Sequence, residues 1–273
     1  MKKFLPVLSM TAISVLTQTA TASDLGFAPA SFDWRGAYFG ANLGAGLNDS
    51  AISGQYAYRG SGTIPPATSA LINQMAFDFD PTDAAFTGGV SVGYNWQYSS
   101  IVLGLEADMS YFDASSSRTR NVNGIVNPVL TPDATLATQR LEATGEWFGT
   151  IRGRLGYAMD NILLYGTGGF AYGYAKASSD FQATNGTEFL NWNGSDNGWT
   201  FGWTLGGGVE YGVDRWTVGL EYLYVDLGSY EWHVDGDVNL ANAGDEAIWQ
   251  DVRDSGSMDY AFSLVRGTVK YRF

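Results

Sequence analysis

The last stretch of the sequence, Met258–Phe273, alternates between two kinds of side chain and ends on an aromatic residue. Every second side chain of an extended strand points to the same side. One side of this stretch is mostly apolar, whereas the other carries Arg266, Lys270 and Arg272. A closed sheet with its apolar side turned to lipid explains both features, because closure satisfies every backbone hydrogen bond inside a membrane. We therefore predict a transmembrane barrel in which this last strand pairs with the first.

The start of the chain is typical of a secretory signal. Lys2 and Lys3 precede an apolar run over residues 4–16, and small residues at 20–22 supply a cleavage site. We expect residues 1–22 to be the signal peptide. The apolar run is too short to span a membrane as a helix, so helical anchoring is not expected.

The remaining chain divides into a short periplasmic leader, predicted at residues 23–33, and a barrel at residues 34–273. Trp199, Phe201 and Trp203 alternate with Thr200 and Gly202, and similar alternation recurs along most of the barrel. The pattern predicts eight antiparallel strands at residues 34–47, 86–96, 101–111, 147–157, 162–175, 199–211, 216–224 and 258–273. In the strand predicted at 162–175, glycine, tyrosine and leucine are so frequent that the pattern assigns neither face.

The predicted connections fall into two length classes. Three are tight turns, at residues 98–100, 158–161 and 212–215, and four are long loops, at residues 48–85, 113–146, 176–198 and 226–257. Outer-membrane barrels have short periplasmic turns and long outer loops. The asymmetry predicts that both ends of the mature chain are periplasmic. Aromatic residues also fall near both ends of the strands, where two aromatic belts are expected.

Composition narrows the class of protein further. The formal net charge is −13, and it becomes −15 without the signal, because Lys2 and Lys3 are lost and no acid is. This balance argues against a nucleic-acid partner, which would need a basic face. The chain has no cysteine, which excludes disulfides and thiolate sites. Abundant glycine and aromatic residues favour a barrel.

A soluble β-sandwich or a lipocalin-like barrel is the alternative, because its strands also alternate. In such a protein the polar side of each strand would be the charged, solvated one. A soluble barrel also has little reason to keep aromatic residues at both ends of its apolar faces. The membrane barrel is therefore favoured.

Several motifs together resemble one family. They are GYNWQ at 93–97, GLEADMSY at 104–111, WFGTIRGRLGYAMDNILLYGTGGFAYG at 147–173, GWTLGGGVEYGV at 202–213, WTVGLEYLYVDLG at 216–228 and the ending VRGTVKYRF. As a set they resemble the RopB-type outer-membrane proteins of alphaproteobacteria, a branch of the opacity-like, eight-stranded porin family. The resemblance implies an abundant, surface-exposed, porin-like barrel of Gram-negative cells without a defined substrate.

The polar faces of the predicted strands carry charges of both signs. An eight-stranded barrel is just wide enough for side chains to fill, and buried ions are costly unless they are paired. We therefore expect a structural charge network in the lumen rather than a selectivity filter, with a narrow water path as the alternative. The predicted network contains Glu106, Asp108, Arg152, Arg154, Glu210, Glu221 and Arg266. The terminal aromatics of the closing strand are Tyr271 and Phe273.

The predicted outer loops are acidic, and the last one has Arg253 as its one cation. Carboxylates attract calcium and magnesium, but no spacing here matches a calcium loop, so solvated loops are the expectation. Four tryptophans in or beside loops, Trp192, Trp199, Trp232 and Trp249, are expected in aromatic belts.

No catalytic residue, metal site or cofactor is predicted, and the chain is not expected to be an enzyme. His233, the sole histidine, has no motif around it and is read as a loop residue. The sequence predicts an integral outer-membrane barrel with a mainly structural, envelope-integrity and surface-display role. The alternatives are a porin-like channel for small polar solutes and a loop-mediated adhesin or ligand-binding surface.

The expected partners follow from the predicted location. They are outer-membrane lipid and lipopolysaccharide, together with the barrel-assembly machinery, which would bind the C-terminal strand. Peptidoglycan and host surface molecules are further candidates.

Overall fold

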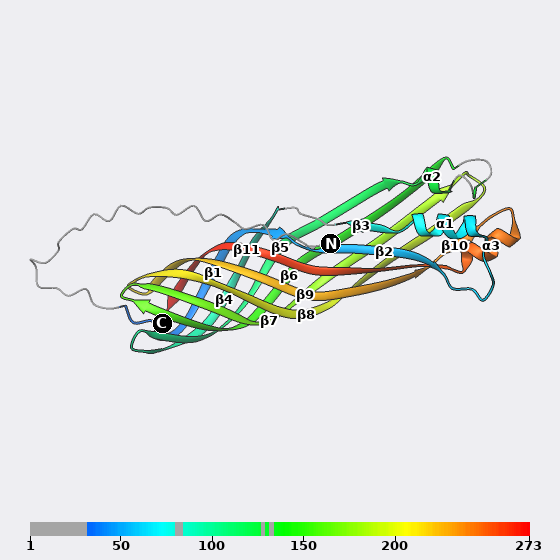
Figure 1. The fold of residues 1–273 in the computed structure, drawn as a ribbon. Helices are drawn as coiled ribbons and strands as arrows, with labels where there is room; N and C mark the ends of the chain where they lie inside the picture. Colours follow the sequence, from blue (N-terminus) through cyan, green and yellow to red (C-terminus); the bar gives the residue numbers. More distant parts are fainter. Residues whose placement is uncertain (1–31, 80–83, 127–128, 131–133) are drawn as a thin grey trace, which may run out of the picture. The chain divides into compact units, whose positions relative to one another are not determined.

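Eight antiparallel strands close into a barrel in the computed structural model, which describes residues 32–79, 84–126, 129–130 and 134–273 (Figure 1). The ring is closed where β1 pairs with β11, from Tyr38 opposite Arg272 to Asn48 opposite Phe262. Its strands are β1 (Gly36–Asn48), β4 (Ala84–Tyr98), β5 (Ile101–Asn121), β6 (Leu136–Met159), β7 (Ile162–Thr184), β8 (Phe189–Val213), β9 (Trp216–Asp235) and β11 (Val252–Arg272). The predicted barrel and its closing pair are confirmed.

One part of the barrel is apolar outside and polar inside. All eight strands contribute outward, exposed apolar side chains to this band, among them Phe39, Leu43, Val90, Leu105, Ile151, Leu164, Leu205, Leu220 and Val269. The sequence pattern did not assign the two faces of β7. In the structure, Leu164 and Phe170 of this strand point outward and Tyr165 points inward. Aromatic pairs lie at both ends of the band, for example Trp216 with Tyr271 at 4.9 Å between ring centroids. No helix in the described part of the chain is long and apolar enough to cross a membrane.

The four segments predicted as long loops do lie at the end opposite the tight turns (Figure 1), but they are largely regular structure, which corrects the predicted strand ends. The ring strands run on beyond the band, and the described residues there add β2 (Ala51–Tyr58), β3 (Phe77–Phe79), β10 (Asp237–Asn239), α1 (Pro66–Gln74), α2 (Asn123–Val126) and α3 (Ala243–Gln250). We call these elements, with the parts of β5–β9 and β11 beyond the band, the outer extension. It lies at the end of the barrel opposite the three tight turns (Figure 1).

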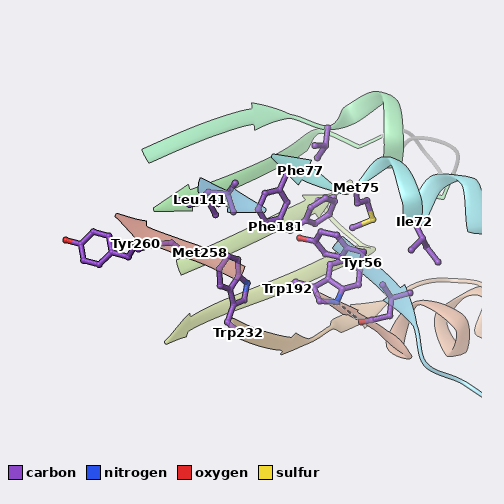
Figure 2. Packing of buried hydrophobic residues seen from close by; sticks show 14 of the residues in the cluster. Tyr56, Ile72, Met75, Phe77, Leu141, Phe181, Trp192, Trp232, Met258 and Tyr260 are labelled. Carbon is purple, nitrogen blue, oxygen red and sulfur yellow. Dashed lines mark hydrogen bonds between the residues drawn. The ribbon is translucent and has the colours of Figure 1, made fainter. Parts of the chain in front are cut away.

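The outer extension consists of two groups of paired strands. One group runs β5–β6–β7–β8–β10, and the other runs β9–β11–β2–β3. Apolar side chains from both groups fill the space between them, among them Tyr56, Phe181 and Trp192 (Figure 2). The centroids of the Tyr56 and Trp192 rings lie 5.6 Å apart, and those of Phe181 and Trp192 lie 5.4 Å apart. The polarity is thus the reverse of that in the band, with apolar residues inside.

This core corrects the prediction for three of the four tryptophans. Trp192, Trp232 and Trp249 are buried in the outer extension rather than placed in an aromatic belt. The indole N–H of Trp192 donates to the carbonyl oxygen of Val252 at 2.8 Å, which joins β8 to β11. Only Trp199 of the four faces outward, and it is 61% exposed.

Candidate functional site in the lumen

The seven charged residues predicted for the lumen all face the interior of the barrel, and each is almost fully buried. Five strands supply them: β5, β6, β8, β9 and β11. Strand register sets two direct pairs, because Glu106 lies opposite Arg152 and Glu221 lies opposite Arg266. Strands that are not neighbours supply further contacts across the barrel.

Arg152 is the centre of the network. Its guanidinium contacts the carboxylates of Glu106, of Asp108 at 3.0 Å and of Glu221 at 2.9 Å. Glu106 and Asp108 are on the neighbouring strand, but Glu221 is on β9, across the interior. The Arg152 side chain has no exposed surface. Bonds of this kind are charge-assisted and stronger than neutral ones.

Lys270 belongs to the network but was absent from the predicted set. Its Nζ lies 2.5 Å from Glu106 and 2.9 Å from Glu210, which in turn accepts from Arg154 at 2.8 Å. Lys270 stands on the cationic side of the last strand, so the sequence did contain the signal. Gly104 makes room here, because a Cβ at that position would lie 2.7 Å from Cγ of Arg154.

Two tyrosine hydroxyls also take part in the lumen network. The pattern of charged residues in the sequence does not predict them. Tyr38 donates to Glu106 at 2.8 Å and accepts from Arg154 at 3.1 Å. Tyr165 donates to Glu221 at 3.0 Å. Hydroxyls can both donate and accept, so they fill positions where an acid or a base alone would leave a group unpaired.

Charges in the lumen balance. Arg266 contacts Glu221 at 2.7 Å and Asp108 at 3.3 Å, which completes a set of four cations and four carboxylates. A paired, hydrogen-bonded and neutral set is the form in which ions tolerate burial. The side chains therefore form a packed polar core and do not line an open path.

An aromatic plug, formed by Phe32 and Trp34, occupies the end of the barrel that has the short turns. Trp34 is 1% exposed, and its backbone N–H donates to Oε1 of Gln97 at 2.7 Å. The Phe32 ring lies 4.6 Å from the Trp34 ring and 4.2 Å from the guanidinium carbon of Arg272. A cavity of about 10 Å³ remains between the plug and Lys270, room for one water at most.

The structure corrects one boundary. The first strand begins at Gly36, whereas the sequence placed its start at about Trp34. Residues 32 and 33 of the predicted leader are described, and Phe32 packs at the barrel mouth. The predicted signal at residues 1–22 and the rest of the leader lie outside the described residues.

The other candidate groups lie away from the lumen. Tyr271 contacts Trp216 on the outer surface, and Phe273 is 77% exposed beside it. His233 is exposed on β9 opposite Ser255. Within the described residues, no group of three histidine or acidic side chains gathers that could hold a metal ion.

Comparisons with known proteins agree with the barrel fold. A model of the outer membrane protein beta-barrel domain matches residues 8–273. The 31 kDa outer-membrane immunogenic protein of Brucella melitensis is 34% identical over 205 residues, 72% of this chain and 73% of that protein. The 22 kDa outer membrane protein of Rhizobium leguminosarum is 34% identical over 166 residues, 60% of this chain and 63% of that protein.

Solved structures that resemble the fold have lower sequence identity to this chain. The outer membrane protein OprG from Pseudomonas aeruginosa is 11% identical, with a TM-score of 0.41 over 88% of this chain and 97% of that one.

Proposed function

Because this chain belongs to the outer membrane protein beta-barrel family, we propose that its outer-membrane barrel serves mainly to build the envelope and display a folded outer surface. The observation that carries the proposal is the filled lumen. Eight paired charges and an aromatic plug occupy the interior where a porin would need a path for solutes. The Brucella and Rhizobium relatives are named as outer-membrane proteins, which agrees with this role.

Moving a solute through this lumen would require separating buried ion pairs. When a buried charge loses its partner in a dry interior, the cost is about 3–5 kcal/mol. Several pairs would have to separate together, because Arg152 alone contacts three carboxylates. The barrel is therefore proposed to be closed to small polar solutes at rest.

The finer assignments are also proposals. We place the short turns and both mature termini in the periplasm, since outer-membrane barrels keep their short turns there. The motif resemblance supports a RopB-type member of the opacity-like branch. Lipid and lipopolysaccharide would surround the apolar band, and β11 would present Tyr271 and Phe273 to the assembly machinery.

A second role, a binding or adhesive surface, is favoured by the outer extension. A surface that binds a partner must hold its side chains in place, and here a buried aromatic core ties both strand groups together. This makes the outer extension a more rigid platform than flexible loops would be. Deleting it should abolish such binding and leave the barrel in the membrane.

Single-channel recording tests the main role. We expect purified mature barrel in a planar bilayer to give no stable openings, because the lumen charges are paired and the mouth is plugged. Arg152→Ala should give small cation-selective openings, since it removes bulk and leaves the lumen with one excess negative charge. Folding of the barrel is verified by the shift in gel mobility between heated and unheated samples, and insertion by its co-flotation with lipid vesicles.

Stable openings of the wild-type barrel, with selectivity altered in Arg152→Ala, would make the lumen a working pore and overturn the proposed role. Arg140→Ala is the matched control. This arginine is on the same strand as Arg152, but its pair with Glu142 is exposed, so the variant should remain silent.

A further inference from the structure

Asp254 is a buried acid in the core of the outer extension, and no arginine or lysine pairs with it among the residues that the structure describes. Asp254 lies on β11, points inward and has no exposed surface. It takes part in none of the ion pairs formed by the described residues. All the buried acids of the lumen, by contrast, contact at least one arginine or lysine.

Hydrogen bonding satisfies this carboxyl only in part. Oδ2 accepts from the hydroxyl of Ser179 on β7 at 2.7 Å, whereas Oδ1 has no hydrogen-bond partner within the described residues. The hydroxyl of Tyr56 and the indole N–H of Trp232 lie close enough to lower its pKa, but neither completes a bond to Oδ1. A buried polar atom without a partner is costly, and more so when it is charged.

The position of Asp254 links its charge to the packing of the two strand groups. Asp254 belongs to the β9–β11–β2–β3 group, and Ser179 belongs to the β5–β6–β7–β8–β10 group. The hydrogen bond between them therefore crosses the core. Asp254 has no exposed surface and its hydrogen bond joins the two groups, so water reaches the carboxyl when the packing between the groups opens locally.

Among the described residues, the groups on the surrounding strands do not pair with Asp254 as a compensating charge. From β2, Tyr56 faces the carboxyl, and burial and the charge of Asp254 raise its pKa, so this phenol stays neutral. From β6, Gln139 donates to Tyr56 at 3.3 Å. The guanidinium of Arg120, on β5, is bonded instead to Gln139 at 2.6 Å and to the carbonyl oxygen of Met75 at 2.6 Å.

We propose that Asp254 makes the outer extension pH-sensitive: the two strand groups stay packed in acid, where its carboxyl is protonated, and separate more readily at neutral pH.

The direction follows from proton linkage. Burial raises the pKa of Asp254 from its ordinary value of 3.8 to about 6 in the packed form. Between these two values the packed form holds a proton that the open form has lost, so packing weakens as pH rises through this range. Above about pH 6 both forms are ionised and the loss is complete. The opening equilibrium should therefore rise about 100-fold between pH 4 and pH 7.

Hydrogen–deuterium exchange of the full mature protein in nanodiscs tests the proposal. Protection is measured from pH 4 to pH 7 as the exchange rate relative to the intrinsic rate of an unstructured peptide at the same pH. We expect residues 252–258 and 178–183 to lose protection about 100-fold, and residues 263–272 in the band to lose none. In Asp254→Asn, both outer segments should keep the acid level of protection at every pH.

Asp259→Asn is the matched control, because Asp259 is an exposed acid on the same strand. It should behave like the wild type. Ser179→Ala provides an independent variant if Asp254→Asn does not fold: loss of the hydrogen bond raises the pKa of the carboxyl further, so the midpoint should move to higher pH. Wild-type protection that does not change with pH, a fall that persists in Asp254→Asn, an equal fall in the band, or an unmoved midpoint in Ser179→Ala would overturn the proposal.

Discussion

Replacing Arg152 with methionine is expected to lower the free energy of unfolding of the barrel by about 3–5 kcal/mol. Methionine keeps an unbranched, flexible side chain but is shorter than arginine and has no charge. The variant leaves Glu106, Asp108 and Glu221 facing one another in a closed interior without the cation that contacts all three. Urea titration of the barrel in lipid vesicles, followed by tryptophan fluorescence, measures the change.

Two comparison variants separate the charge from the loss of packing. Arg140→Met removes an exposed arginine of the same strand and should cost no more than about 1 kcal/mol. Adding Glu106→Gln to Arg152→Met makes the lumen neutral again, so the double variant should be more stable than Arg152→Met alone. A loss in Arg152→Met no larger than that in Arg140→Met would show that the network contributes little to stability.

The membrane half of this fold follows closely from its sequence, because lipid and lumen impose opposite demands on alternate residues. Trp199, Phe201 and Trp203 had to face one way, and the register of a closed ring then fixed which charges meet. Once Glu106 and Arg152 lie opposite each other on adjacent strands, their contact follows from geometry. The contact between Arg152 and Glu221 does not, since it depends on how the barrel interior is filled.

The outer extension escaped prediction because its pattern is inverted. On β8, Leu190 and Trp192 face the core at even positions, whereas Trp199 and Phe201 face outward at odd positions. Apolar residues therefore move from even to odd positions near residue 198. The alternation of apolar and polar residues is interrupted there, and the interruption is interpreted as the end of a loop. The strand in fact continues, and only its surroundings change, from a polar lumen and lipid to an apolar core and water.

On other strands, bulges are a second reason why the sequence pattern misplaces the strand ends. The register shifts between Gly145 and Trp147 on β6, and on β9, where Asp226 lies opposite Ala261 and Ser229 lies opposite Asp259 of β11. Near the second shift, Gly228 has a φ of 77°, a left-handed conformation that glycine adopts at little cost. A bulge moves later side chains to the opposite face, so a single alternating frame cannot describe these strands.

The aromatic core of the outer extension should therefore respond strongly to one substitution. Trp192→Ala is expected to lower the local stability of the outer extension by about 3–5 kcal/mol, because it leaves a cavity among Tyr56, Phe181 and Trp249. It also removes the indole hydrogen bond to the Val252 carbonyl. The ring strands in the band should stay folded, since their stability depends on lipid contact and on the lumen network.

Proteinase K digestion of vesicles that hold the oriented barrel measures this difference. Trp192→Ala should be cut within the outer extension under conditions in which the wild type is intact, while the strands in the band remain protected. Trp199→Ala is the matched control, because this tryptophan is seven residues further along the same strand but faces outward and leaves no internal cavity. Equal resistance of Trp192→Ala and the wild type would mean that the aromatic core does not hold the outer extension together.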